Sequence, residues 1–285
     1  MSVDNFKPEI HAATVEREME KALIFGSDAI INRDYEGEIA QVGDTVSINS
    51  IGSVTVGDYD GTDIGDPEEL TGAETKLVIT EQKFFNFRVD DVDKRQATGQ
   101  LMTTGMAQAA YDVADTIDQY IASLYTDMTL VTGTEGTPKS LATATDAYDD
   151  VILPMKTALS DAKCPSQGRW MILPPWFIAK LQQDDRFVAY SAADQMALRM
   201  NGVVGRCAGF QIFESTNVPE TSRHTGSKVM AGIKEAWTFA AQTPPKEMEA
   251  YRPQKLFADA VKGLTLYGAK VVRSDKLVYS ICSET

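Results

Sequence analysis

The side chains best suited to bind a cation lie in one stretch rich in Asp and Gly, DYDGTDIGDPEELTGAE at residues 58–74. Carboxylate oxygens are among the ligands that Ca²⁺ prefers in proteins. Four carboxylates of this stretch are candidates: Asp58, Asp60, Asp66 and Glu69. Counted from Asp58, however, an EF-hand calcium loop requires Gly at the position of Asp63. We therefore predict a solvated, turn-rich tip that binds no metal.

Catalytic side chains are scarce in this sequence. The only two histidines are His11 and His224, and no Gly-x-Ser-x-Gly motif marks a serine hydrolase. Cys207 follows Arg206, which could lower the pKa of its thiol, but no histidine is near it in the sequence, so we interpret it as a small buried residue. The glycines of GVVGRCAG, residues 202–209, do not have the spacing that binds a dinucleotide or a phosphate. The sequence thus predicts no catalytic residue and no cofactor.

The overall charge also restricts the function. The chain has 285 residues, with 41 acidic and 27 basic side chains and a net charge of −14. Such a charge disfavours binding to nucleic acid or to an anionic membrane, since both attract lysine and arginine. No apolar run approaches the roughly 20 residues that span a bilayer, and the first residues do not resemble a signal peptide. Three distant cysteines without a Cys-x-x-Cys pair favour reduced thiols in a cytosol.

A long amphipathic helix is the strongest structural signal. Between residues 93 and 127, apolar residues recur at steps of three and four: Met106, Ala110, Val113, Ile117, Ile121 and Leu124. This spacing places them on one side of an α-helix, which we expect to be buried. Polar residues occupy the opposite side: Asp112, Asp115, Asp118 and Gln119. We expect that side to face solvent or a partner. Asp93 and Gln96 have the spacing of a capping box, and Gly105 should weaken the first turns.

Two stretches before this helix alternate apolar and polar residues, which is typical of strands with one buried face. The apolar positions are Val46 and Ile48 in the first stretch and Phe85, Phe87 and Val89 in the second. Together with the acidic tip between them, the two stretches predict a long hairpin arm. Because an isolated two-stranded ribbon is marginal in water, we expect its stability to come from contacts outside itself.

The rest of the chain predicts an arm before the strands and a compact domain after the long helix. Val15 and Met19 belong to a narrow apolar stripe in a short helix, so this helix must dock on another surface. Residues 145–243 alternate short helices and strands, and Pro154 should interrupt the first helix. Residues 264–281 predict a closing hairpin that turns at residues 274–275.

This order of elements resembles the major capsid protein of tailed double-stranded DNA bacteriophages. The local similarity is best in KALIFGSDAIINRDYEGEIAQVGDTVSINSIGSVTVGDYDG, residues 21–61, above all at 32–37 and 43–46. The resemblance implies an α+β fold, the tailed-phage major capsid fold. Its parts would be an N-terminal arm at 1–35, an extended β-hairpin loop with peripheral-domain strands at 36–92, a long spine helix of the peripheral domain at 93–130, an axial domain at 131–248 and return strands of the peripheral domain at 249–285.

The resemblance also implies a structural function and no enzymatic activity. The subunit would self-assemble into hexamers and pentamers of an icosahedral capsid that encloses double-stranded DNA without sequence-specific binding. Expected partners are further copies of the chain, a separate scaffolding protein, a portal protein and, as a further option, a decoration protein; no membrane is expected. The protein would be made in the host bacterial cytoplasm and would reside in the virion.

Eight residues are expected to contact other subunits: Val15, Met19, Asp58, Tyr59, Asp60, Asp66, Glu69 and Asp115. Some relatives cross-link their subunits through a lysine in the extended loop, but residues 58–74 contain no lysine. Lys76 and Lys83 lie on the returning stretch, so we predict no cross-link.

Two alternatives remain open at this point. An encapsulin-like compartment would have the same fold and would enclose a cargo protein in place of DNA. A soluble acidic hydrolase, from a different functional class, would use His224 together with a nearby carboxylate.

Overall fold

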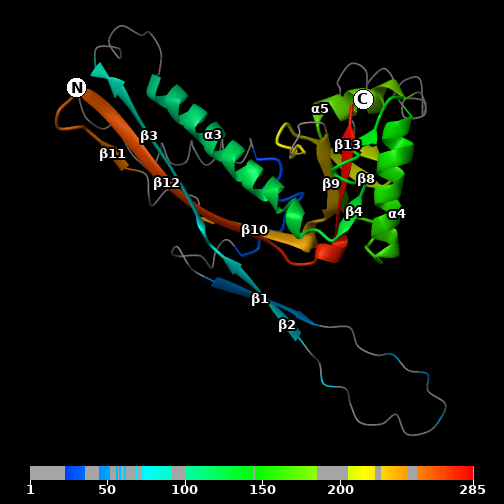
Figure 1. Cartoon of the computed structure of the whole chain (residues 1–285). Helices are drawn as coiled ribbons and strands as arrows, with labels where there is room; N and C mark the ends of the chain where they lie inside the picture. Colours follow the sequence, from blue (N-terminus) through cyan, green and yellow to red (C-terminus); the bar gives the residue numbers. More distant parts are fainter. Residues whose placement is uncertain are drawn as a thin grey trace.

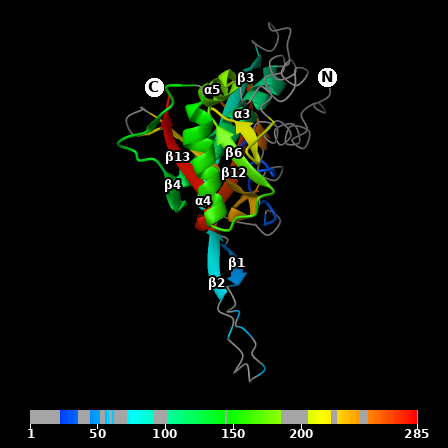
Figure 2. The same cartoon turned by 90° about the vertical axis from the view of Figure 1, so that its right-hand side faces the viewer.

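The computed structural model describes eight ranges of the chain and four single residues. They are 23–35, 45–51, 72–91, 101–143, 145–184, 205–221, 226–242 and 249–284, with residues 56, 58, 61 and 69. Strands in these ranges form a four-stranded sheet, a seven-stranded sheet and a two-stranded hairpin (Figure 1). The hairpin points away from the body in both views, and the long helix α3 runs beside the four-stranded sheet (Figures 1 and 2).

The four-stranded sheet is built around its longest strand, β12 (Ala258–Val271). β3 (Glu81–Asp90) pairs antiparallel with one edge of β12. β10 (Trp237–Gln242) and β11 (Glu249–Tyr251) pair antiparallel with successive parts of the other edge. The apolar face of β3 packs against the main hydrophobic core, as its alternation predicts.

The helix α3 (Leu101–Ser123) packs its apolar side on β3. The predicted stripe is confirmed by five buried residues: Met106, Ala110, Val113, Ile117 and Ile121. Gly105 has a role that its low helix propensity does not suggest. A Cβ atom at this position would lie 2.9 Å from the ring of Phe87, so only glycine lets helix and strand approach this closely without displacing that ring. The proposed cap at residues 93 and 96 lies outside the described residues.

α3 ends in a 3-10 turn, η3 (Leu124–Asp127), where the two sheets meet. Asp127 pairs with Lys270 of β12 at 3.3 Å, and the rings of Tyr120 and Tyr267 meet edge to face with centroids 5.3 Å apart. These contacts fix the end of the helix against β12. Within the ranges described above, no helix is both long and apolar enough to cross a membrane.

The seven-stranded sheet has the order β4-β13-β9-β6-β8-β7, and β5 also pairs with β13. Its strands are β4 (Leu130–Thr132), β5 (Lys139–Ser140), β6 (Arg169–Leu173), β7 (Arg206–Cys207), β8 (Phe210–Glu214), β9 (Ser227–Ile233) and β13 (Leu277–Ser283). β6 and β9 are buried along their whole length, so both faces of this sheet are covered. The helices α4 (Leu153–Asp161) and α5 (Pro175–Gln183) cover one of these faces (Figure 1).

Contrary to the prediction, the first helix of this region continues through Pro154. A π-helical turn, η4 (Ala147–Ile152), precedes α4 (Leu153–Asp161), and Pro154 lies in the first turn of α4. The N–H of Leu153 donates to the carbonyl of Tyr148, so the backbone is continuous from η4 into α4, and the proline, which has no N–H, lies where the hydrogen-bonding pattern changes from π to α. α5 (Pro175–Gln183) also begins with proline, as its sequence predicts.

The prediction that one returning strand forms the arm is wrong. β1 (Thr45–Ile51) pairs antiparallel with β2 (Gly72–Val78) to form the hairpin. The chain then breaks at Ile79 and Thr80, and β3 pairs with β12. The physical reason is that the apolar face of β3 is required against α3 and cannot serve the arm as well.

The predicted closing hairpin is wrong as well. A turn, η6 (Ser274–Lys276), follows β12, but β13 then pairs with β9 and β4 in the other sheet. β13 is buried along nearly its whole length and finds partners for both of its edges only there. β10 was expected in the axial domain at 131–248. It instead pairs with β12 and completes the four-stranded sheet.

The buried side of α3 leads to a stability prediction. Replacing Ile117, which is fully buried, by alanine should lower the free energy of unfolding by about 2–5 kcal/mol, because the cavity is closed on all sides. Thr104→Ala, at an exposed position of the same helix, should change it by under about 0.5 kcal/mol. Urea denaturation of the unassembled subunit measures both values, and equal stabilities would mean that the buried side is misassigned.

Candidate assembly surfaces and the joint between them

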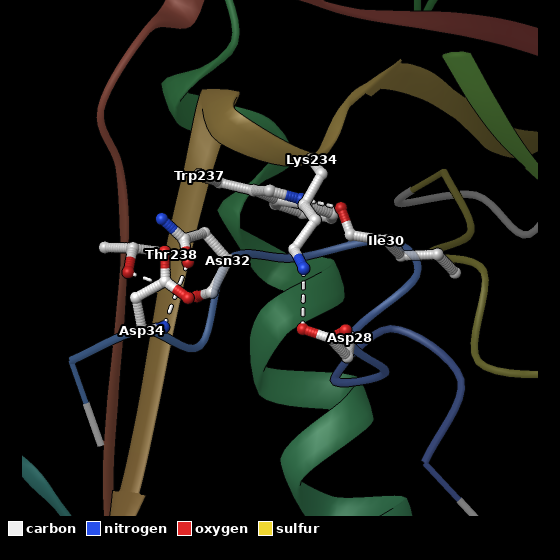
Figure 3. A network of polar contacts seen from close by, with 7 residues as sticks. All are labelled: Asp28, Ile30, Asn32, Asp34, Lys234, Trp237 and Thr238. Carbon is white, nitrogen blue, oxygen red and sulfur yellow. Dashed lines mark hydrogen bonds and ion pairs between the residues drawn. The ribbon is translucent and has the colours of Figure 1, made fainter. Parts of the chain in front are cut away.

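Residues 23–35, here called the joint, connect the hairpin to the body, and Figure 3 shows how they are held. Asn32 forms an isolated parallel bridge with β10. Its N–H donates to the carbonyl of Trp237 at 3.3 Å, and its carbonyl accepts from the N–H of Phe239 at 2.9 Å. The indole N–H of Trp237 donates in turn to the carbonyl of Ile30 at 2.9 Å. The joint is therefore bonded to the four-stranded sheet through its backbone.

A buried carboxylate on α3 holds the other end of the joint. Asp118 is 2% exposed; its Oδ2 accepts from the N–H of Ile24 at 2.7 Å and its Oδ1 from that of Gly26 at 3.1 Å. The expectation that Asp118 faces solvent or a partner is wrong. The row Ala114, Asp118, Ala122 is buried beside the main stripe. The sequence did contain a signal that Asp118 is buried: an alanine lies four residues before it and another four residues after it. Such small side chains let another backbone segment approach the helix.

This environment changes the titration of Asp118. Burial raises the pKa of the carboxyl to about 6, although hydrogen bonds from the backbone N–H groups of the joint oppose the rise. The negative charge of Asp115 raises the pKa slightly further. The carboxyl that holds the joint therefore changes its charge near neutral pH.

Residues 32–35, the described part of the motif at 32–37 that supports the family resemblance, form a turn. The Asn32 side chain accepts from the N–H of Asp34 at 3.0 Å and so stabilises the turn (Figure 3). The Arg33 guanidinium lies 5.9 Å from the ring centroid of Phe239. Beside the motif, Lys234 pairs with Asp28 at 2.6 Å, and this hydrogen bond lowers the pKa of Asp28. Because Asp28 is exposed, the pair adds little stability.

The hairpin is attached to the body at its base. Six residues of the hairpin, the four-stranded sheet and the link between them form a separate small core: Val46, Ile48, Leu77, Ile79, Ala240 and Leu266. Gly268 of β12 permits this contact, because a Cβ atom there would lie 2.6 Å from the carbonyl oxygen of Val78. The ladder then continues outward to the pair of Ile51 and Gly72. The base of the arm is thus fixed, and its outer part extends beyond the body.

Two of the predicted contact residues in the acidic tip, Asp58 and Glu69, are exposed, as is the neighbouring Val56, at 93%. Five others lie outside the described residues: Val15, Met19, Tyr59, Asp60 and Asp66. The structure therefore presents part of the tip to solvent and does not test the remaining contacts.

The eighth predicted contact residue, Asp115, is already used within the subunit. Its Oδ1 accepts from the amide of Asn217 at 2.7 Å, and its Oδ2 accepts from Gln119 at 2.9 Å. Asn217 belongs to the loop after β8, so Asp115 ties α3 to the seven-stranded sheet. The expectation of a free polar side is wrong at this position. Asp112, one turn earlier, is exposed, and its carboxylate accepts a bond from Gln108 at 2.9 Å along the helix.

The residues considered for catalysis do not form a site in the described structure. Cys207 is buried, as predicted, and burial raises the pKa of its thiol to about 12, so it is not a nucleophile near neutral pH. His11 and His224 lie outside the described residues. Among those that are described, no three His, Cys, Asp or Glu side chains gather as a metal site would require.

The titration of Asp118 predicts a pH dependence of stability. Between its ordinary pKa of 3.8 and about 6, the folded protein holds a proton that the unfolded chain has released. The stability due to this proton is complete below about pH 4 and is lost as the pH rises through 6; it amounts to about 3 kcal/mol. Asp118→Asn cannot titrate.

We therefore expect the unfolding free energy of the wild type, relative to that of Asp118→Asn, to fall as the pH rises from 4 to 7. Urea denaturation of both unassembled subunits across this range measures the difference. A difference that does not change with pH would show that the carboxylate remains ionised in the folded protein.

Comparisons with known proteins agree with this arrangement. The sequence matches the profile of the phage capsid protein family over residues 73–280. The fold is similar to a solved chain of Mycobacterium phage Che8, with 27% identity, a TM-score of 0.73 and 90% of each chain covered. It is also similar to chains from the capsids of cyanophage P-SCSP1u (17% identity, TM-score 0.68, 93% of this chain and 89% of that one) and Ralstonia phage GP4 (14%, 0.64, 93% and 90%).

The sequence matches none of the curated proteins with which it was compared. The family profile nevertheless covers well over half of the chain, and the fold has the arm, the long helix and the two sheets that the resemblance implies. These findings favour a capsid shell over a nanocompartment and over a hydrolase. The chain belongs to the phage capsid protein family and is a structural protein of the capsid shell.

Proposed function

We propose that the subunit forms hexamers and pentamers of an icosahedral shell that encloses double-stranded DNA, and that the β1–β2 hairpin is the arm that joins neighbouring subunits. The observation that carries this proposal is the attachment of the hairpin. Among its described side chains, those at its base pack on the body through the small core that contains Val46 and Leu77, and its strands point away from the rest of the molecule (Figures 1 and 2).

The physical argument concerns the outer part of the arm. A two-stranded ribbon is marginally stable in water, and the exposed Val56 beyond the ladder finds no cover within the described part of the subunit. Contact with a neighbouring copy would bury this surface. In a closed shell each subunit both gives and receives the same contact, so every arm is covered.

The remaining expected contacts fit the same assembly. We infer that Val15 and Met19 of the N-terminal arm dock on a neighbour, together with Tyr59, Asp60 and Asp66 of the tip. Asp115 contributes less than the sequence suggests, since both of its oxygens are bonded within the subunit. Asp112 on the exposed side of α3 is better placed to meet another subunit.

We also propose domain boundaries that follow the two sheets. The four-stranded sheet with α3 would be the peripheral domain, and the seven-stranded sheet with α4 and α5 the axial domain. Compared with the boundaries at 131–248 and 249–285, this assignment moves β10 to the peripheral domain and β13 to the axial domain. A separate scaffolding protein, a portal protein and a decoration protein would be further partners, and synthesis would take place in the bacterial cytoplasm.

The arm can be tested by shortening it without disturbing the ladder. Residues 52–71 are replaced by Asn-Gly, which joins the paired residues Ile51 and Gly72 through a two-residue turn. The unassembled subunit should unfold at the same temperature as the wild type, because the base of the hairpin is intact. Closed particles, measured by sedimentation and electron microscopy, should be lost.

A control variant keeps the length of residues 52–71 but replaces them with a Gly/Ser sequence. Comparing it with the shortened chain distinguishes the effect of the arm's length from the effect of its specific side-chain contacts. Normal particles from the shortened chain would overturn the assignment of this hairpin as an intersubunit arm.

A further inference from the structure

A cleft lies where the hairpin leaves the body. Its volume is about 750 Å³. One wall is formed by Tyr35 of the joint and Ile48 of β1. The opposite wall comes from the loop after α4 and from the turn η6, drawn in red at the lower end of the body in Figure 1. The cleft is therefore the angle between the arm and the seven-stranded part of the body.

The cleft is cationic in a chain that is strongly anionic. It is lined by Lys163, Arg273 and Lys276 against a single carboxylate, that of Glu235, while the whole chain carries a net charge of −14. The Lys276 ammonium is occupied, since it donates to the carbonyl of Ala162 and pairs with Asp275 at 3.0 Å.

The other two cations have no partner within the part of the chain that the structure describes. Lys163 and Arg273 are exposed, and none of the ion pairs there involves them. Two positive charges therefore face the cleft without a neutralising carboxylate. Since one wall of the cleft is the arm itself, an anion bound there would also contact the arm.

Lys163 has an unfavourable backbone conformation. It follows α4 with φ = 54°, the left-handed region in which glycine is usual at the end of a helix. Its N–H donates to the carbonyl of Ser160, and the N–H of Cys164 donates to that of Leu159, both at 2.9 Å. Glycine would make the same turn without strain. Replacing Lys163 by glycine should therefore not disturb this turn.

We propose that this cleft binds the acidic tip, residues 58–74, of a second copy of the chain; this inference rests on the proposed shell assembly. The tip has seven carboxylates and neither lysine nor arginine: Asp58, Asp60, Asp63, Asp66, Glu68, Glu69 and Glu74. Its charge thus complements that of the cleft, and opposite charges select and orient a partner at an interface. The tip and the cleft occupy different parts of the subunit, so the contact can repeat from copy to copy around a ring.

The described ladder of the hairpin runs away from the subunit's own cleft. Ile48 lines the cleft, and the ladder continues three residues further to the pair of Ile51 and Gly72, a distance of about 10 Å at ~3.4 Å per residue. Both strands point away from the body in the two views (Figures 1 and 2). The carboxylates of a neighbouring copy are therefore the better match.

The first test removes the two unpaired charges from the full-length chain. Lys163→Gly combined with Arg273→Gln should leave the melting temperature of the unassembled subunit unchanged or slightly higher, because glycine relieves the backbone strain at residue 163. The yield of closed particles, measured by sedimentation, should fall at least tenfold. A control with the same loss of charge, Lys156→Gln with Lys255→Gln at exposed positions outside the cleft, should assemble like the wild type.

A charge exchange makes this test specific. Lys163→Glu with Arg273→Glu should abolish assembly, and adding Asp66→Lys and Glu69→Lys to the same chain should restore it. Normal particles from Lys163→Gly/Arg273→Gln would overturn the inference and leave the shell function standing, whereas a wild-type chain that forms no particles would overturn both. A loss confined to DNA-filled particles, with empty shells unaffected, would assign the cleft to DNA and would also overturn the inference.

A cross-linking experiment shows whether the contact is between copies. Two variants are coexpressed: Lys163→Gly, which keeps the acidic tip, and a chain with Lys163 in which the seven tip carboxylates are changed to amides. A carbodiimide joins carboxylates to amines without a spacer. Mass spectrometry of mixed particles should find Lys163 linked to a tip carboxylate, which can only come from the other chain. Absence of this link in intact mixed particles would contradict the proposal.

Discussion

One buried carboxylate determines where the joint of this subunit lies. Asp118 projects from the C-terminal part of the long helix and accepts hydrogen bonds from the N–H groups of Ile24 and Gly26, which would otherwise be buried without partners. Beyond this point the joint follows β10 through the bonds of Asn32 and leads toward β1. The start of the arm is therefore set by the helix and by the four-stranded sheet together.

The same helix relates the two halves of the fold to each other. Its apolar side packs on β3, its end contacts β12 through Tyr120, and its polar side reaches the loop after β8 through Asp115. A rigid helix fixed to both sheets keeps the cleft and the base of the hairpin in one geometry. Repeated contacts in a closed shell require such a constant geometry, since small angular errors accumulate around a ring.

Much of this fold could be predicted from the sequence, and the failures have physical causes. Periodicity identified α3 and β3, because one side of each packs on apolar neighbours and the other does not. It could not show that β12 and β13 pair in different sheets, since pairing depends on partners distant in the chain. Asp118 was predicted to be exposed because the residue type alone does not distinguish an aspartate that is buried with backbone partners from one in solvent. The strain at Lys163 has no sequence signal at all.

The position of β13 has a consequence for the time at which a subunit can be incorporated into a shell. β13 lies between β4 and β9, yet it follows every other strand of that sheet in the chain. During synthesis the sheet therefore lacks an interior strand until β13 has left the ribosome, and β9 and β4 have no strand between them before then. Until then the seven-stranded sheet of the nascent chain is incomplete. A nascent chain whose β13 has not yet emerged would be excluded from a growing particle without any separate checkpoint.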